Sequence, residues 1–104
     1  MWHLMEINKE KLDSKVIIKL IGRLDTTSAP VLQDNLMPEF TYEAQVELDF
    51  GEITYVSSAG LRVILMATKA AKSNSGRLTL INVSDDVNEI FQMTGFADIL
   101  EIKT

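Results

Sequence analysis

The chain has no cysteine and a single histidine, His3, among its 104 residues. The lack of cysteine excludes disulfide bonds, thiol catalysis and thiolate metal sites. No apolar run reaches the roughly 20 residues that a membrane-spanning helix needs. The start of the chain, MWHLMEINKE, also lacks the basic and apolar segments of a signal peptide. We therefore expect a cytoplasmic protein without membrane insertion, metal, cofactor or enzymatic activity.

Basic residues are outnumbered as well. The chain has 10 lysines and arginines against 15 aspartates and glutamates, which gives a net charge of -5. This balance disfavours non-specific binding to nucleic acid or to an anionic membrane, and it argues against aggregation. Hydrophobic residues make up 46% of the chain, which is enough to build a core. The length predicts a single domain over residues 1–104, and we expect a monomer when the protein is free.

The residue patterns predict five short strands and three helices in the order β-β-α-β-α-β-α-β. The expected strands cover 4–7, 15–22, 44–50, 77–83 and 98–102, with a polar connection, KEKLDS, over 9–14. The expected helices run from 27 or 28 to near 37, from 57 or 58 to 73, and from 84 to 95. Strand 44–50 alternates apolar and polar side chains, so one of its faces is expected to be open to solvent. We predict an α/β fold, a mixed four- to five-stranded sheet with helices mainly on one face.

The segment ITYVSSAGLRVIL, residues 53–65, places two adjacent serines where a strand pattern changes to a helix pattern. Either Ser57 or Ser58 can cap the helix, because a serine oxygen can accept a hydrogen bond from an N–H group of the first turn. At 100° per residue, one helix face is apolar and is expected to be buried. The opposite, exposed ridge is expected to carry Ser58, Arg62, Met66, Lys69 and Ser73.

Three segments closely resemble the STAS domain of bacterial anti-sigma factor antagonists. They are LDFGEITYVSSAGLRVIL at 48–65, GRLTLINVSDDVNEIFQMTGFADILEI at 76–102, and GRLD at 22–25. The resemblance covers roughly residues 4–102, with the elements in the same order and spacing. It implies a STAS-like fold over the whole chain.

The resemblance also implies a partner switch. The unphosphorylated form would bind an anti-sigma factor, a serine kinase that carries the ATP site, and would thereby release the sigma factor. The kinase would phosphorylate a serine at the start of the second helix and so switch binding off, and a serine phosphatase would reset the cycle. Alignment on the Gly60–Leu61 pair implies that Ser58 is the phosphorylated residue.

Around Ser58 the chain departs from the family pattern. Better-known members have an acidic residue before the phosphorylated serine and a small hydroxyl residue after it, where this chain has Ser57 and Ala59. Ser57 is therefore an alternative phosphorylation site. Asp25 and Asp49 match acidic positions that lie near the site in the family. Together with the exposed ridge, the resemblance implies a partner-binding set of Asp25, Asp49, Ser57, Ser58, Arg62, Met66 and Lys69.

Two other functions fit parts of the sequence. STAS domains also serve as non-catalytic scaffold subunits of lipid-transport ABC complexes or of stress-sensing assemblies, but Ser58, the exposed ridge and GRLD favour the antagonist role. A serine hydrolase would need a glycine two residues before and two residues after its nucleophile. Ser58 has Gly60 on one side and Val56 on the other, and the single histidine lies at the terminus.

Overall fold

A computed structural model describes residues 5–103, so His3 lies outside the described residues. The strands are β1 (Glu6–Lys11), β2 (Val16–Leu24), β3 (Gln45–Val56), β4 (Arg77–Ile81) and β5 (Ile102–Lys103). The α-helices are α1 (Ala29–Leu36), α2 (Ser58–Ser73) and α3 (Asp85–Met93), and the short 3-10 helices are η1 (Met37–Glu39) and η2 (Phe96–Asp98). The predicted order of strands and helices is confirmed. Among the described residues, no helix combines the length and the apolar character that crossing a membrane requires.

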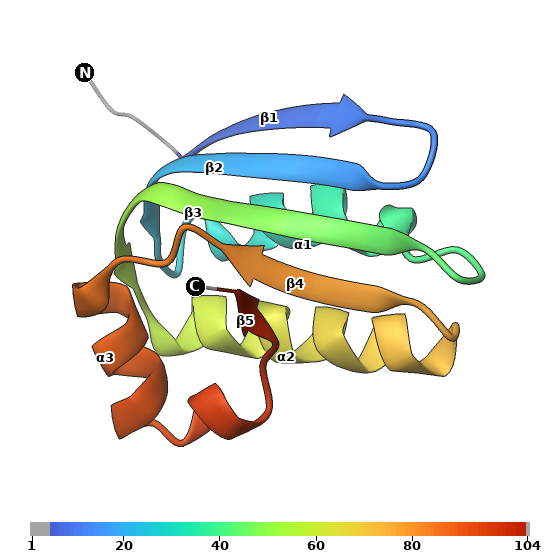
Figure 1. The fold of residues 1–104 in the computed structure, drawn as a ribbon. Coiled ribbons are helices and arrows are strands. Elements are labelled where there is room, and N and C mark those ends of the chain that lie inside the picture. Colours follow the sequence, from blue (N-terminus) through green and yellow to red (C-terminus); the bar gives the residue numbers. More distant parts are fainter. Residues whose placement is uncertain (1–4, 104) are drawn as a thin grey trace.

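The five strands form one mixed sheet in the order β1-β2-β3-β4-β5. β1 is antiparallel to β2, and each later strand is parallel to the one before it. Crossover connections between parallel strands are right-handed, and here each step moves in the same direction across the sheet. The connecting helices therefore lie on one side, as Figure 1 shows for α1 and α2. This confirms the predicted one-sided cover.

The core lies between the sheet and the helices. In the first half of β3 the side chains of Val46, Leu48 and Phe50 are buried, which confirms the predicted alternation, and Ile53 and Val56 are buried further along the strand. Phe50 contacts Phe91 of α3, with their ring centroids 6.1 Å apart and their planes tilted by 56°. Both rings are fully buried, so α3 is fixed against the carboxyl-terminal half of the sheet. The opposite face of the sheet, which we call the open face, carries the polar side chains of the strands.

The first strand lies later in the chain than the sequence predicts. β1 covers Glu6–Lys11, so the first half of the segment predicted as a polar connection pairs with β2. Backbone pairing does not require apolar side chains in an edge strand. Lys9 also holds the strand in place: its Nζ lies 2.7 Å from a Glu39 carboxylate oxygen and 2.9 Å from the Asn35 carbonyl oxygen. The hydrogen bond from Lys9 Nζ to the Glu39 carboxylate is the main cause that lowers the pKa of Glu39.

The last two strands are shorter than predicted, since β4 ends at Ile81 and β5 has only two residues, whereas β2 and β3 are longer. The prediction of a strand over 98–102 is wrong for most of its length, because β5 begins at Ile102. Gly95 adopts a left-handed φ of 80°, and the Phe96 carbonyl oxygen then accepts hydrogen bonds from both Ile99 and Leu100, which curls this segment. At their carboxyl ends, β2 and β3 stay paired as far as Leu24 and Val56, beyond the ends that the sequence predicts. These extensions carry the chain directly to the two serines.

Candidate functional site

The passage from β3 into α2 fixes the roles of the two serines. Ser57 has an extended backbone and is the N-cap of α2, and its Oγ accepts a hydrogen bond from the Gly60 N–H at 3.2 Å. The Ser57 N–H donates to the Leu24 carbonyl oxygen at 2.8 Å, which joins this turn to the end of β2. Of the two capping serines that the sequence allows, the structure therefore selects Ser57.

Ser58 is the first residue of α2, and its side chain is exposed. Within residues 5–103 its hydroxyl forms no hydrogen bond, and the cap of α2 is made by Ser57. The first turn of a helix has N–H groups without helical partners and a partial positive charge. An anion attached to Ser58 would therefore meet a favourable electrostatic environment.

Gly60 allows the first turn of α2 to lie directly on β2. A Cβ atom at this position would come within 2.6 Å of Leu24 Cγ and 3.0 Å of the Leu24 carbonyl oxygen. Leu24 is fully buried, so its side chain has little room to move away. The absence of a side chain at Gly60 thus sets how closely the start of α2 approaches the sheet, and with it the position of Ser58.

Replacing Ser57 with alanine is expected to lower the free energy of unfolding by about 1 kcal/mol. The substitution removes the side-chain acceptor of the Gly60 N–H, and loss of an N-cap typically costs about 0.5–2 kcal/mol. Urea unfolding of the two proteins measures the difference. Ser58→Ala is the matched control and is expected to unfold like the unmodified protein. Equal destabilisation by both substitutions would contradict the assignment of the cap to Ser57.

The exposed ridge of α2 lies where the helical spacing predicts it. Buried residues line the face toward the sheet: Gly60, Leu61, Val63, Ile64, Ala67, Thr68 and Ala71. On the opposite side, Ser58, Arg62, Met66, Lys69 and Ser73 are all exposed. Among the described residues, neither Arg62 nor Lys69 belongs to an ion pair. Their charges are therefore available to a partner or to a modification at Ser58.

The turn that contains Ser57 and Ser58, between β3 and α2, is called the serine turn. Asp25 lies beside it, directly after Leu24, whose carbonyl oxygen accepts the hydrogen bond from the Ser57 N–H. Its carboxylate oxygen Oδ1 accepts hydrogen bonds from the backbone N–H groups of Thr27 and Ser28, each at 3.0 Å. The Ser28 hydroxyl completes the turn: it accepts from the Asp25 N–H at 2.9 Å and donates to the Arg23 carbonyl oxygen at 2.6 Å. Asp25 therefore stabilises the turn between β2 and α1, a role that the sequence pattern did not predict.

The Asp25 carboxylate is expected to contribute to stability in a pH-dependent way. The hydrogen bond from the Ser28 N–H is the main cause that holds the pKa of Asp25 below its ordinary value. A lowered pKa in the folded state means that the contribution is complete above the ordinary pKa and is lost as the pH falls through the folded value. The stability difference between the protein and Asp25→Asn should therefore stay constant from neutral pH down to about pH 5 and narrow as the pH falls below the ordinary carboxyl pKa of about 4. Urea unfolding at several pH values measures this difference, and a constant difference would contradict the expectation.

Asp49 lies farther from the serines than Asp25 does. Asp49 lies in β3, seven residues before Val56 at the end of the strand. Its partners in the sheet are Lys19 of β2 and Ile81 of β4. Its Oδ1 accepts hydrogen bonds from the Gly51 N–H at 2.9 Å and the Asn82 side-chain amide at 3.1 Å. The contacts of Asp49 thus join β3 to the end of β4, and no hydrogen bond among the described residues links Asp49 to Ser57 or Ser58.

Two residues next to the serine turn were missed by the sequence analysis. Arg23 and Tyr55 are partners in the β2–β3 pairing, and the Arg23 guanidinium carbon lies 4.4 Å from the centre of the Tyr55 ring. Each precedes a buried residue, Leu24 or Val56, and so points to the open face. No simple alternation indicates them, because the buried residues of β3 lie three positions apart from Phe50 to Val56 and the pairing depends on a register shift after Gly22.

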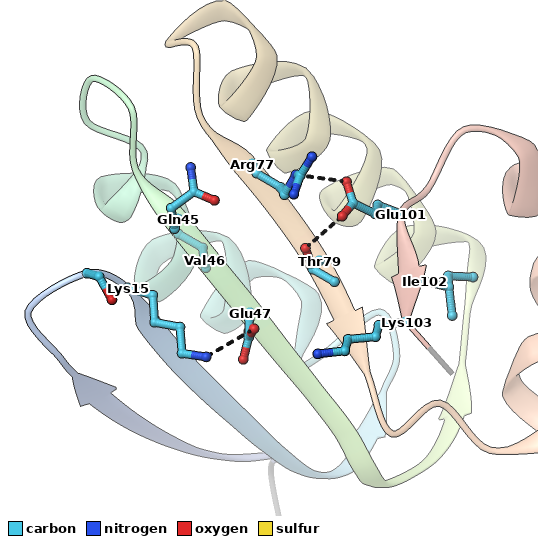
Figure 2. A pocket seen from close by; sticks show the side chains of 10 residues that line it. Lys15, Gln45, Val46, Glu47, Arg77, Thr79, Glu101, Ile102 and Lys103 are labelled. Atoms are coloured by element: carbon cyan, nitrogen blue, oxygen red, sulfur yellow. Dashed lines mark hydrogen bonds and ion pairs between the residues drawn. The ribbon is translucent and has the colours of Figure 1, made fainter.

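A shallow hollow of about 590 Å³ lies on the open face, at the opposite end of the parallel strands. It surrounds the starts of β3 and β4, whereas the serine turn follows the end of β3. Figure 2 shows that its charged side chains are largely paired with one another. Lys15 contacts Glu47 at 3.3 Å, and Glu101 contacts Arg77 and accepts a hydrogen bond from Thr79, each at 3.2 Å. Because the hollow lies at the opposite end of the strands from Ser57 and Ser58, it is separate from the candidate site.

The comparison with protein families settles the family of this chain. The family model of the STAS domain matches residues 6–104. The chain belongs to the STAS-domain family. The anti-sigma-B factor antagonist of Listeria monocytogenes is 32% identical to this STAS domain over 96 residues, which are 91% of this chain and 84% of the relative. The anti-sigma-B factor antagonist of Bacillus subtilis is 29% identical over 98 residues, 94% of this chain and 90% of the relative.

Solved structures share the fold of this STAS domain. The anti-sigma factor antagonist SpoIIAA in its unphosphorylated form has a TM-score of 0.77 and 21% sequence identity, and the match covers 95% of this chain and 89% of SpoIIAA. The Bacillus cell fate determinant SpoIIAA in its phosphorylated form has a TM-score of 0.71 and 20% identity, with 95% and 92% covered. These likenesses confirm the predicted STAS-like fold.

Proposed function

We propose that this STAS domain is an anti-sigma factor antagonist controlled by phosphorylation of Ser58. The unphosphorylated form binds an anti-sigma factor with serine kinase activity, and the sigma factor is released. The observation that supports this most directly is an exposed, unbonded serine at the first turn of α2, in a chain whose relatives are named anti-sigma factor antagonists. The chain acts by binding and not by catalysis, and its place of action is the cytoplasm.

The structure favours Ser58 over Ser57 as the phosphorylated residue. The Ser57 oxygen accepts the hydrogen bond that caps α2, and its side chain is only half exposed. A kinase that used Ser57 would have to withdraw this acceptor from the helix. Ser58 is exposed and its hydroxyl has no such role, so it can enter a kinase active site without disturbing the helix.

A phosphate on Ser58 is expected to leave the fold intact. It adds about -1.5 to -2 charges at neutral pH. An anion at an exposed helix N-terminus gains about 0.3–1 kcal/mol. Arg62 lies one helical turn further along the same ridge, where a side chain four residues away can reach its neighbour. The domain itself therefore has no electrostatic reason to unfold or rearrange when Ser58 is phosphorylated.

The switch instead acts on the complex with the partner. An interface that encloses a neutral hydroxyl would have to enclose a phosphate of about -1.5 to -2 charges, which the single charge of Arg62 balances only in part, and burying uncompensated charge costs several kcal/mol. Asp25 adds negative charge beside the turn, although Arg23 Nε lies 3.8 Å from its carboxylate and offsets part of this charge. A serine phosphatase that removes the phosphate would restore binding. The partner surface comprises Ser57, Ser58, Asp25 and the ridge residues Arg62, Met66 and Lys69, with Asp49 at its margin.

The decisive experiment is intact-mass analysis with site mapping on the protein isolated from its native host. Phosphate that maps to Ser58 and disappears in Ser58→Ala supports the proposed cycle. Phosphate on Ser57 would retain the mechanism and move the site by one residue. No phosphate under any growth condition, together with co-purification of a transporter ATPase or a large stress-sensing assembly, would favour a scaffold subunit and contradict the proposal.

A further inference from the structure

The Arg23 side chain is held in one orientation beside the serine turn. It stacks on the Tyr55 ring at 4.4 Å, and its Nε lies 3.8 Å from the Asp25 carboxylate. Nevertheless the Arg23 side chain is 61% exposed and Tyr55 is 38% exposed. Stacking uses the flat faces of a guanidinium group and leaves the N–H donors free at its edge. This arrangement restricts the side chain without consuming its hydrogen-bonding capacity.

The Arg23 donors have no hydrogen-bond acceptor among residues 5–103. The Asp25 oxygen Oδ1 is occupied by two backbone N–H groups of its own turn, and Oδ2 is too far from Arg23 Nε for a hydrogen bond. Two other cations of this part of the open face are paired: Lys19 of β2 lies 2.8 Å from Glu52, and Lys15, directly before β2, lies 3.3 Å from Glu47. Arg23 therefore differs from its neighbours in combining a fixed position with unused donors.

We propose that Arg23, positioned by Tyr55, determines partner specificity by binding a carboxylate group of the anti-sigma factor. This inference rests on the proposed function and extends the partner surface from α2 around the end of β2 and β3 to the open face. A planar guanidinium group matches a carboxylate with two parallel hydrogen bonds. Arginine and tyrosine are also the residue types that dominate binding energy at interfaces.

Charge supports a partner with an acidic group. The chain has a net charge of -5, so an acidic surface is repelled by most of this molecule. At the site, however, Arg23 and Arg62 are both exposed and frame the serine turn from the open face and from the ridge of α2. A carboxylate on the partner would therefore select this end of the domain. Because Tyr55 already restricts Arg23, little side-chain entropy is lost on binding.

The test compares Arg23→Ala, Arg23→Lys and Tyr55→Leu in titrations of the anti-sigma factor kinase from the same bacterium. Arg23→Ala is expected to weaken binding about tenfold or more, and Arg23→Lys to recover only part of the loss because a lysine cannot form the planar pair. Tyr55→Leu is expected to weaken binding by a smaller factor. Lys19→Ala is the matched control, because Lys19 is an exposed cation of the same strand and face. It should bind within about twofold of the unmodified protein.

The outcomes separate this inference from the proposed function. If Arg23→Ala binds like the unmodified protein while Ser58→Glu does not, the partner switch stands and the role of Arg23 is overturned. Equal losses for Lys19→Ala and Arg23→Ala would also overturn it, since they would report only net charge. If the unmodified protein does not bind the kinase at all, both proposals fail. Unchanged urea midpoints for the variants would show that the losses arise at the interface.

Discussion

Replacing Ser58 with glutamate is expected to weaken binding to the anti-sigma factor by about 100-fold or more, which corresponds to about 2.8 kcal/mol. The hydroxyl is exposed and unbonded in the free protein, so the substitution has little effect on the fold. In the complex, the carboxylate would be enclosed by a partner surface that fits a neutral hydroxyl, and the cost of burying a charge in this way is several kcal/mol. Calorimetric titration of the purified anti-sigma factor kinase into each form of the protein measures the change.

Ser73→Glu is the matched control for this prediction. Ser73 is the last residue of α2 and is exposed on the same ridge, so the substitution makes the same change in net charge at the far end of the helix. It is expected to bind within about threefold of the unmodified protein, since exposed charges more than about 10 Å apart are largely screened. Equal weakening by both substitutions would show that bulk charge is responsible and would contradict a local switch.

Replacing Gly60 with alanine is expected to lower the free energy of unfolding by about 1–3 kcal/mol. The new Cβ would lie 2.6 Å from Leu24 Cγ, so the first turn of α2 has to move away from β2 or Leu24 has to leave its position. Alanine favours a helix by about 1 kcal/mol relative to glycine, which offsets part of the loss. Because the shift displaces Ser58, binding to the anti-sigma factor should weaken as well. Urea unfolding and titration with the kinase measure the two effects.

Gly51→Ala is the corresponding control in β3. A Cβ at Gly51 would contact side chains only, Asp49 Oδ1 at 3.1 Å and Asn82 Cβ at 3.4 Å, at an exposed position. We expect a change of less than about 1 kcal/mol in stability and none in binding. A second variant, Leu24→Val combined with Gly60→Ala, should be more stable than the sum of the single losses predicts, because the smaller side chain relieves the contact. Strict additivity would contradict the proposed close approach.

The sequence predicted those parts of the fold that depend on side-chain periodicity. The alternation of Val46, Leu48 and Phe50 correctly placed the open face of the sheet, and the 100° spacing after Ser58 correctly separated the buried and exposed faces of α2. β1 was misplaced because an edge strand is held by backbone hydrogen bonds and by the Lys9 contacts, neither of which produces an apolar pattern. β5 was misplaced because the turn that follows Gly95 consumes an apolar segment.

The candidate site was predicted in position but not in detail. Ser57 and Ser58 are adjacent and chemically identical, so the sequence cannot say which of them caps the helix, and the hydrogen bond to the Gly60 N–H decides it. The role of Asp25 in its own turn depends on backbone geometry that has no residue signature beyond Asp and Ser three positions apart. The contact between Arg23 and Tyr55 joins residues 32 positions apart in the sequence and depends on the strand register.

The charged edge strand β1 has a consequence for contacts between copies of this protein. Two copies could extend the sheet if their β1 strands paired in an antiparallel way. Directly opposed side chains in such a pair point to the same side of the sheet, so the possible registers keep both open faces on the same side. Centring the pairing on Asn8 places Glu6 opposite Glu10 of the second copy, and centring it on Lys9 places Lys9 opposite its own equivalent. Like charges directly opposed destabilise such pairs. In both of these registers the opposed charges disfavour edge-to-edge pairing of β1 with its own copy, although the outer backbone of this edge strand is unpaired.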